Sequence, residues 1–343
     1  MKSKYRQLKK IIDNAQNILI PFHLSPDGDM VGSGLALAAY CQSLGKKVRV
    51  VTATPVDSDW GFLPYFDLIE DKDPADLDLS QFDLIIFADC DGPYRVSKQD
   101  NFTIPDIVST ATIDHHPTNK EQCSLNIVDT QTVSSAVQLI LYFFEEFNIN
   151  ITKDIATLLY WGLIMDTGVF EYGKNLSAAH TDAVRLLKLD VPHDELIFRM
   201  KCQSSPQFIK YIARGLSNLQ VDNEAGFCWM ALSYKELKEM GLENEKFKYG
   251  LTPYLKTVKG TEFGTVFVEE KPDYIRGSLR SRRQDGFDVS ALAKALGGGG
   301  HRAAAAFTLE MPFKEAEELV LAKAREYGKA FISSRGTRTC TLD

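Results

Sequence analysis

The chain has 343 residues, of which 44% are apolar and 10% aromatic, enough for two domains with a sizeable core. Acidic residues outnumber basic ones by 46 to 39, so the net charge is −7. A protein that wraps duplex nucleic acid needs a broadly basic surface, and the composition therefore excludes long duplexes as partners. A short phosphorylated ligand in a local basic pocket is still compatible with it.

Three features predict a cytoplasmic protein with no membrane partner. The six cysteines show no CxxC spacing, which indicates reduced thiols instead of a zinc site or a disulfide framework. The N-terminal segment MKSKYRQLKKIIDNAQ is too polar for a signal peptide. No apolar run approaches the roughly 18 residues that a membrane span requires.

Short apolar runs alternate with helical patterns in the first half of the chain. The alternation predicts a mainly parallel sheet that is covered on both faces. The predicted strands are Asn17–Phe22, Lys47–Thr52, Phe82–Ala88 and a strand that ends with Ala111–Ile113. The predicted helices are Val31–Leu44, a helix from Thr132 onward and Asp154–Met165.

The alternation of strands and helices lapses between residues 192 and 217, and a linker is predicted there. The fold class is therefore α/β, with an N-terminal parallel-sheet domain (1–191) joined to a smaller α/β domain (218–330) and a polar tail (331–343). Elements predicted in the second domain are strands at Gly226–Leu232, Thr265–Glu269 and Tyr274–Ser281, a helix from about Val289 and a helix at about Phe313–Tyr327.

Carboxylates and imidazoles follow three predicted strands and one predicted helix: His23, Asp27, Asp29, Asp89, Asp114, His115, His116 and Asp166. The carboxyl ends of parallel strands share one sheet edge, so these side chains are expected to converge. A mixed His and Asp set suits a transition-metal ion with hard character, such as Mn²⁺. The number of ligands is enough for two ions with bridging Asp side chains, and such pairs suit in-line displacement at phosphorus.

Each motif alone also has a structural interpretation. Asp27 and Asp29 could cap the following helix, and a lone Asp after a strand is often a helix cap or a solvated acid. His115 and His116 are more specific, because adjacent histidines at a strand end have little reason to be core residues. The joint occurrence of these motifs favours the metal site. The two histidines outside these loop motifs, His180 and His193, are expected at the surface.

The second domain contains a candidate phosphate pocket. Period-two spacing places Arg276, Ser278, Arg280 and Arg282 on one face of a strand, and guanidinium groups bind phosphate oxygens in pairs. The backbone of Gly297–Gly300 could approach an anion, with His301 as a further donor. A glycine run alone is more often a helix C-cap. Next to the arginine strand, the glycine run indicates a phosphate pocket. The positive charge is then concentrated in this pocket, although the net charge of the protein is negative.

Four segments, HLSPDGD, DLIIFADCD, ATIDHHP and MDTGVF, resemble in order and approximate spacing the metal motifs of the DHH-family phosphoesterases. LRSRR and LGGGGHRAAAA resemble the substrate-binding strand and the glycine–histidine motif of that family's DHH-associated C-terminal domain. The resemblance covers about residues 15–325. The two-domain plan is most similar to the bacterial nanoRNase/pAp phosphatase group (NrnA type), since RecJ exonucleases are longer and type II inorganic pyrophosphatases lack the GGGH pattern.

The resemblance implies roles for individual residues. The implied metal ligands are His23, Asp27, Asp29, Asp89, His115 and Asp166, with Asp89 and Asp166 in contact with both ions. Asp114 and His116 would orient ligands or contact the phosphate, and together with Asp89 and Asp166 they form the catalytic set. The implied substrate-binding residues are Arg280, Ser278, Gly298, Gly299, Gly300 and His301. One departure is Ala306, where the family usually has glycine, so a methyl group there would narrow the pocket or shift the strand.

The implied function is a phosphodiesterase with two Mn²⁺ ions that degrades very short oligoribonucleotides, such as pApA, to mononucleotides and also acts as a pAp 3′-phosphatase. One alternative is hydrolysis of a cyclic dinucleotide such as c-di-AMP. An alternative of another class is a nucleotide-binding regulator without turnover, which the full ligand set disfavours. Polyphosphate or pyrophosphate hydrolysis is disfavoured by the GGGH domain. The sequence leaves the oligomeric state open, a homodimer included.

Overall fold

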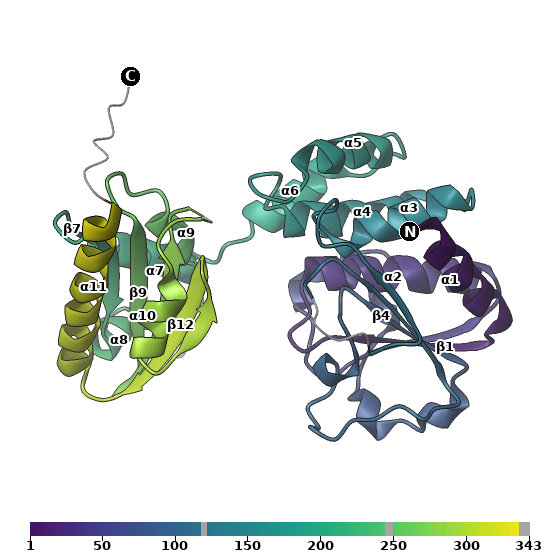
Figure 1. Cartoon of the computed structure of the whole chain (residues 1–343), viewed down its shortest axis with the longest axis horizontal. Coiled ribbons are helices and arrows are strands. Elements are labelled where there is room, and N and C mark those ends of the chain that lie inside the picture. The colour runs from purple at the N-terminus through teal and green to yellow at the C-terminus, as the bar shows by residue number, and fades with distance from the viewer. Residues whose placement is uncertain (118–121, 244–249, 284, 336–343) are drawn as a thin grey trace. The chain divides into compact units, whose positions relative to one another are not determined.

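The computed structural model describes residues 1–117, 122–243, 250–283 and 285–335 (Figure 1). The chain forms two compact units, Met1–Met200 and Lys201–Asp343. The boundary falls inside the segment predicted as a linker, but that segment contains two helices, α6 (His193–Lys201) and α7 (Pro206–Ser217). Ser205 caps α7 with its hydroxyl group, which accepts a hydrogen bond from the Phe208 N–H at 3.0 Å. Only a few residues between these helices are therefore non-helical.

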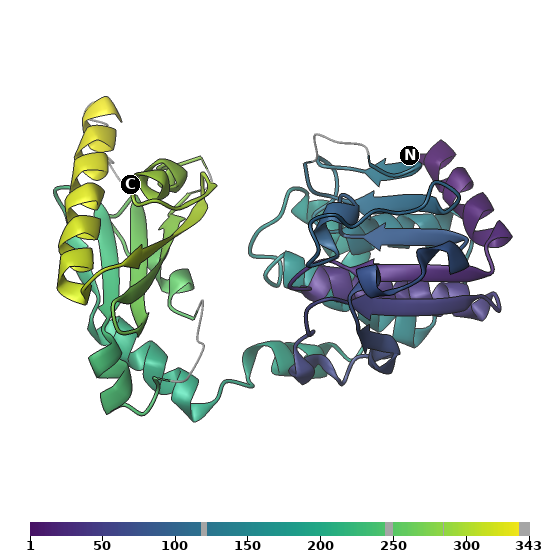
Figure 2. The ribbon, with the colours of Figure 1, turned by 90° about the horizontal axis from the view of Figure 1, so that it is seen from below.

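The first unit is built on a six-stranded parallel sheet, which confirms the predicted fold class. The strand order β3-β2-β1-β4-β5-β6 reverses direction between β1 and β4. Figure 2 shows these strands side by side. The two short edge strands, β3 and β6, were missed because three or four residues give no usable periodicity. The strands are β1 (Asn17–Phe22), β2 (Lys47–Thr52), β3 (Ile69–Asp71), β4 (Leu84–Ala88), β5 (Ser109–Asp114) and β6 (Leu125–Val128).

Among the described residues, the α-helices of this unit cover one face of the sheet, with α5 packed on α4 (Figure 1). The opposite face is covered by loops and short 3₁₀ turns, in which Leu79, Phe82 and Val96 are buried against alternate residues of the strands. Both faces are thus covered, as predicted, but the second cover is not helical, because Pro, Gly and Asp interrupt those connections. The helices are α1 (Lys2–Asn14), α2 (Gly28–Ser43), α3 (Ala136–Glu146), α4 (Lys153–Asp166) and α5 (Leu176–Leu187).

Helix α2 begins three residues earlier than predicted and packs closely on α4. The Asp27 carboxylate accepts hydrogen bonds from the N–H groups of Asp29 (3.1 Å) and Met30 (3.0 Å) and so caps the helix. At Gly32 the backbones of the two helices nearly touch, since a Cβ there would lie 2.4 Å from the Leu158 carbonyl oxygen. This contact sets the spacing between Asp29 at the start of α2 and the end of α4.

The second unit has its own six-stranded sheet, in the order β11-β12-β10-β9-β8-β7. Only β8 and β9 are parallel, and the other neighbours are antiparallel. Its strands are β7 (Gln220–Asp222), β8 (Phe227–Leu232), β9 (Phe263–Lys271), β10 (Tyr274–Ser281), β11 (Gly299–His301) and β12 (Ala304–Glu310). Its further helices are α8 (Tyr234–Glu239), α9 (Thr252–Leu255), α10 (Val289–Ala295) and α11 (Phe313–Arg335).

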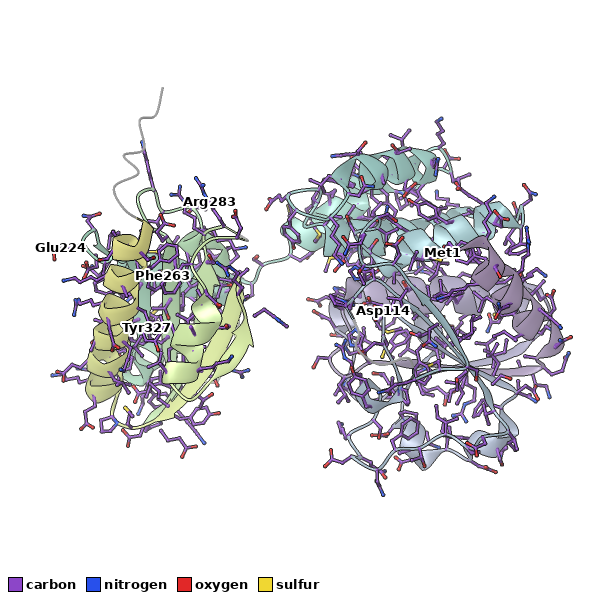
Figure 3. All side chains as sticks on the ribbon, in the orientation of Figure 1. Met1, Asp114, Glu224, Phe263, Arg283 and Tyr327 are labelled. Carbon is purple, nitrogen blue, oxygen red and sulfur yellow. The ribbon has the colours of Figure 1, made fainter. Side chains whose placement is uncertain are left out.

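One face of the second sheet forms a core with α10 and α11, in which Phe263 stacks on Phe287 with ring centroids 3.9 Å apart (Figure 3). Phe331 packs on Phe287 in turn, which explains why α11 runs through residues predicted as tail, up to Arg335. The rest of the predicted tail lies outside the described residues. No helix within the described ranges is both long and apolar enough to cross a membrane.

The two histidines predicted at the surface differ in their surroundings. His180 is exposed, as predicted, and stacks on Phe170. The prediction for His193 is wrong, because this residue is half-buried and its Nδ1 lies 2.7 Å from the Tyr160 hydroxyl group. The reason is that α6 packs against α4, which no local pattern in the sequence indicates.

The close approach at Gly32 generates a prediction. Gly32→Ala should lower the free energy of unfolding by about 1–3 kcal/mol, because the added methyl group meets a backbone oxygen that cannot rotate away. Urea denaturation measures this effect. The control is Gly61→Ala in an exposed turn at φ −57, where an added Cβ would lie 3.2 Å from the Ser58 carbonyl oxygen and an exposed turn can adjust, so the change should be smaller, below about 1 kcal/mol. Equal stabilities of the two variants would contradict the prediction.

Candidate metal centre

The carboxyl ends of β1, β4 and β5 carry the predicted His and Asp residues. His23 follows β1 and Asp89 follows β4, on the two sides of the point where the strand order reverses. Ligands bind at this point in open α/β sheets, because the loops on either side diverge and leave a crevice. Asp114 is the last residue of β5 and lies inside the first unit (Figure 3), and Asp166 is the last residue of α4.

The structure brings all eight predicted residues together in three overlapping groups. Within each group, one ligand atom per residue lies within 4.8 Å of the others. Asp89 belongs to two of the groups, and so does His115. The groups are His23, Asp27 and Asp89; Asp29, His115 and Asp166; and Asp89, Asp114, His115 and His116.

Asp89 is the centre of this arrangement. Its Oδ2 lies 3.7 Å from His23 Nε2, and its Oδ1 lies 3.3 Å from His115 Nε2. The side chain is buried, yet neither of its oxygens has a hydrogen-bond partner among the described residues, and the same holds for His115 Nε2. Buried polar atoms normally have partners, so these atoms fit divalent cations bound between them. The backbone of Asp89 is left-handed (φ 47), a strained conformation that clusters at functional sites.

Asp114 and His116 form a connected pair beside Asp89. Asp114 Oδ1 accepts hydrogen bonds from the N–H groups of His115 (2.7 Å) and His116 (3.1 Å) and lies 2.9 Å from His116 Nδ1. This carboxylate therefore fixes both histidine backbones and the orientation of the His116 ring. The two acids Asp114 and Asp89 raise the pKa of His116 to about 11, so in this state the ring is an imidazolium.

Asp29 is held by the first turn of α3. Its Oδ2 accepts a hydrogen bond from the Ala136 N–H at 2.6 Å, and its Oδ1 accepts one from the Val137 N–H at 3.1 Å. The same Oδ2 lies 3.7 Å from His115 Nε2. A carboxylate has about four lone-pair sites, so two backbone bonds leave capacity for an ion. This helix terminus was not predicted as part of the site, although Ser134 and Ser135 before an apolar helix were a usable signal.

Burial and the neighbouring charges shift the pKa values of the acids in this site. Burial raises the pKa of Asp29 well above its ordinary value, and the charge of Asp89 adds to this effect. Burial likewise raises the pKa of Asp166 to about 7, although His115 opposes the shift. Burial also acts to raise the pKa of Asp89, but the surrounding imidazoles, led by His115, outweigh it and the net shift is downward. A dense set of carboxylates with unequal proton affinity is typical of a functional site.

Asp27 has two functions in the structure. It caps α2, as the structural interpretation predicted, and its Oδ1 also lies 3.9 Å from His23 Nε2. Its side chain is 55% exposed, unlike that of Asp89 at 1%. The capping bond orients the carboxylate toward His23, so the two interpretations of this loop are compatible.

Two further features of the site had not been found in the sequence. The Lys174 ammonium group donates a hydrogen bond to the His115 carbonyl oxygen at 2.9 Å and so ties the loop after α4 to the β5 end. Gly168, Val169 and Phe170 are three consecutive left-handed residues directly after Asp166 and Thr167. The Thr167 hydroxyl group stabilises this turn, since it donates to Leu163 O at 2.7 Å and accepts from Phe170 N at 3.1 Å.

The predicted phosphate-binding residues belong to the second unit. Ser278, Arg280, Gly299 and His301 lie on one face of its sheet, whereas Gly300 pairs with the buried Ala305. The register pairs Ser278 with Ala306 and Ala306 with Gly299, and it pairs Arg280 with Ala304 and Ala304 with His301. Arg276 and Arg280 alternate with the buried Ile275 and Leu279, as the period-two pattern predicts. Small residues on β12 thus separate the arginines of β10 from His301 of β11. Ala306 is exposed on this face and leaves the strand register intact, so its methyl group narrows the surface and does not shift the strand.

The structure corrects the assignment of Gly298 as an anion-binding backbone group. The Gly298 N–H donates to Ala293 O at 2.8 Å, and the N–H of the left-handed Gly297 donates to Lys294 O at 3.1 Å. These two bonds end α10 in a Schellman motif, so the Gly298 N–H is not available to a ligand. A Cβ at Gly298 would also lie 2.1 Å from Ala306 O, so there is no room for a side chain at this position. Gly299 has open space around its α-carbon instead.

Comparison with known proteins gives a consistent result. The model of the DHH family, N-terminal domain, matches residues 17–163, and that of the DHHA1 domain matches residues 251–330. The chain is 30% identical over 291 residues to a probable bifunctional oligoribonuclease and PAP phosphatase NrnA from Streptococcus mutans, covering 83% of this chain and 86% of that protein. It is 29% identical over 315 residues to the bifunctional oligoribonuclease and PAP phosphatase NrnA of Thermus thermophilus, covering 90% of this chain and 89% of that protein.

The fold is also shared with a solved structure. An exopolyphosphatase-related protein from Bacteroides fragilis matches with a TM-score of 0.88 at 23% identity, over 97% of this chain and 98% of that one. At this identity the match shows the fold alone. The family models, the relative at 30% identity and the His–Asp cluster agree with one another. The chain therefore belongs to the DHH family of phosphoesterases.

Proposed function

We propose that this protein is a Mn²⁺-dependent phosphodiesterase that degrades very short oligoribonucleotides to mononucleotides in the cytoplasm, and that it also removes the 3′-phosphate of pAp. The observation that carries the proposal is the buried cluster in which Asp89 and His115 are each shared between ligand groups. The names of the two relatives support the same pair of activities.

The ligand groups support two ions. The first would be held by His23, Asp27 and Asp89, and the second by Asp29, His115 and Asp166. Asp89 presents one oxygen toward His23 and the other toward His115, which suits a bridging role. Imidazole together with carboxylate favours Mn²⁺ over Mg²⁺, which prefers oxygen ligands. When bound, two such ions supply an activated water and neutralise the charge of the phosphoryl oxygens.

The residues around the ions would orient the reacting groups. Asp114 holds His116 in place, and the imidazolium form of His116 can donate a hydrogen bond to a phosphoryl oxygen or to the leaving oxygen. Lys174 places a further positive charge near this edge of the site. Asp166 would contact both ions in the proposal, and its position 3.3 Å from His115 Nε2 supports at least the contact with the second ion.

The second unit would hold another phosphate or the nucleotide end of the substrate. Arg280, Ser278, Gly299, Gly300 and His301 are the proposed contacts, with Arg276 further along the same strand. From Arg276 to Arg280 the strand advances only about 14 Å, at ~3.4 Å per residue. A long single strand would need a longer basic groove with stacking aromatics, which a net charge of −7 disfavours. The proposed substrates are therefore two to a few nucleotides long.

The raised pKa of Asp166 generates a pH prediction. Below about pH 7 this carboxyl holds a proton that an ion must displace, so the Mn²⁺ affinity should fall as the pH decreases, by about tenfold per pH unit for one proton. Isothermal titration calorimetry between pH 5 and 8, in buffers of different ionisation enthalpy, measures the affinity and the protons released. A pH-independent affinity would contradict this assignment.

The same shift has a consequence for stability. Because the pKa of Asp166 is raised from 3.8 in the unfolded chain to about 7, the folded metal-free protein binds the proton more tightly. The contribution of the protonated Asp166 carboxyl to the stability of the fold is fully present below pH 3.8 and is lost as the pH rises toward 7. Urea denaturation of the metal-free protein should therefore show this contribution decreasing over that range, and Asp166→Asn should reduce the pH dependence.

The central position of Asp89 generates the next prediction. Asp89→Ala should lower the hydrolysis rate more than His23→Ala, by about another tenfold or 1.4 kcal/mol, because it removes contacts to both ions. The metal-free variant should still unfold cooperatively at a similar temperature, because the repulsion that Asp89 exerts on Asp29 and Asp166 is lost together with its attraction to the neighbouring imidazoles. Rates at saturating Mn²⁺ and thermal unfolding test both points. A sharply lower unfolding temperature would show that Asp89 is a structural residue.

Substrate length tests the proposed function itself. Single-turnover hydrolysis of 5′-labelled RNAs from two to about twenty nucleotides should be fastest for dinucleotides and fall steeply with length, with pAp also hydrolysed. Arg280→Ala should weaken dinucleotide hydrolysis by about 1.5–3 kcal/mol without a change in Mn²⁺ affinity. The matched control is Arg283→Ala, since Arg283 is exposed on the loop after β10 (Figure 3). Equal rates at all lengths would refute the proposal, and a strong preference for c-di-AMP would favour the cyclic-dinucleotide alternative.

A further inference from the structure

We propose that Gln138 and Asp182, which are not metal ligands, are positioning residues that set the metal affinity of the site. They would do so by holding the first turn of α3 against the Asp29 carboxylate. The inference deepens the proposed function, because it rests on Asp29 as a ligand. Both side chains are buried, with 1% exposure each.

The first step is the contact between α3 and Asp29. The Ala136 and Val137 N–H groups each donate to one oxygen of this carboxylate. Two bonds from a rigid helix turn fix the rotation of the carboxylate and so decide which lone pairs face His115 and Asp166. The bond from Ala136 also lowers the pKa of Asp29 against the effect of burial. The ligand geometry of Asp29 therefore depends on where the first turn of α3 lies.

The second step is how this turn is held. Ser135, at the N-cap position, makes no side-chain capping bond, and its buried hydroxyl oxygen has no partner among the described residues. Gln138 binds the backbone just before the helix, since its Oε1 accepts a hydrogen bond from the N–H group of Ser134, the residue before the N-cap, at 2.7 Å. In a capping box the third helical residue bonds the N-cap N–H group, so this contact resembles one half of that motif, shifted by one residue. The chain at the start of α3 is therefore held by the Gln138 amide, together with the Ser134 hydroxyl group, which accepts a hydrogen bond from the Asn175 N–H at 3.4 Å.

The third step is the orientation of that amide. The Gln138 Nε2 group donates to Asp182 Oδ2 at 2.6 Å. A carboxylate is only an acceptor, so Asp182 forces the NH₂ group to its own side and leaves Oε1 for Ser134. Tyr142 donates to the same Oδ2 at 2.7 Å, and Arg185 donates to Oδ1 at 3.0 Å. These donors compensate a buried charge on α5, which makes no hydrogen bond to a proposed metal ligand among the described residues.

The chain of contacts runs from Asp182 through Gln138 to the α3 turn and then to Asp29. Asp182→Asn removes the charge that orients the amide. Gln138 can then turn its NH₂ group toward the Ser134 N–H group, and the hydrogen bond from Ser134 N–H to Gln138 Oε1 is lost. Gln138→Met removes the amide and keeps a similar volume. Both changes should loosen the α3 turn and lower Mn²⁺ affinity, with the expected loss about tenfold, at the lower end of the range for residues that orient metal ligands.

Two control variants separate this effect from a general loss of stability. Tyr142→Phe removes a bond to the same Asp182 oxygen but leaves Gln138 oriented. Glu236→Gln weakens a comparable network in the second unit, where Glu236 accepts from Ser233, Asn218 and Arg214. Both controls should lower the thermal unfolding temperature of the metal-free protein while their Mn²⁺ affinity stays within about twofold of the original.

The experiment is calorimetric titration of the full-length chain and its variants with Mn²⁺ alone, together with thermal unfolding of the metal-free proteins. Weaker binding in Asp182→Asn and Gln138→Met, with unchanged binding in both controls, supports the inference. If Asp182→Asn does not fold, Gln138→Met and its controls decide the question. Unchanged affinity in the variants, or an equal loss in Tyr142→Phe, overturns the positioning role. Failure of the original chain to bind Mn²⁺ overturns the proposed metal centre instead, so the two failures are distinguishable.

Discussion

The first unit depends on keeping several carboxylates close together in a buried volume. At an effective dielectric constant near 20, two like charges 4 Å apart repel each other by about 4 kcal/mol, and burial adds a desolvation penalty. The structure offsets this cost with imidazoles around Asp89 and backbone donors at Asp29, and the raised pKa of Asp166 lets that carboxyl hold a proton below about pH 7. The remaining negative potential and the unpaired buried oxygens of Asp89 fit the site for a divalent cation.

The sheet topology explains how residues more than 140 positions apart reach one site. The reversal of strand order between β1 and β4 opens a crevice, and α2 and α4 bring Asp29 and Asp166 to it from the helical layer. The contact between those helices at Gly32 is close enough that no side chain fits between them. A rigid scaffold of this kind holds ligand atoms at distances that loops alone would not maintain.

The acidic and basic side chains discussed above belong to different units of the protein. Acids dominate the composition, and the acidic metal site lies in the first unit. The arginines of β10 lie on the face of a different sheet that is opposite to α10 and α11, beside the core that α7, α8 and α9 form over β8 and β9. A protein with net negative charge can in this way present a local cationic surface to a phosphate, because screening confines each field to about 8–10 Å.

The sequence by itself determined the fold class, four strands of the first sheet and all eight His and Asp residues of the cluster, because strand periodicity and the convergence of parallel strand ends are local rules with one geometric outcome. It could not show that Asp27 both caps a helix and faces His23, that Gly298 ends α10 or that His193 is half-buried. Each of these depends on which partner lies opposite in space. Only the tertiary structure decided that the first turn of α3 donates to Asp29 and that Gln138 donates to Asp182, since those contacts join residues up to 108 and 44 positions apart.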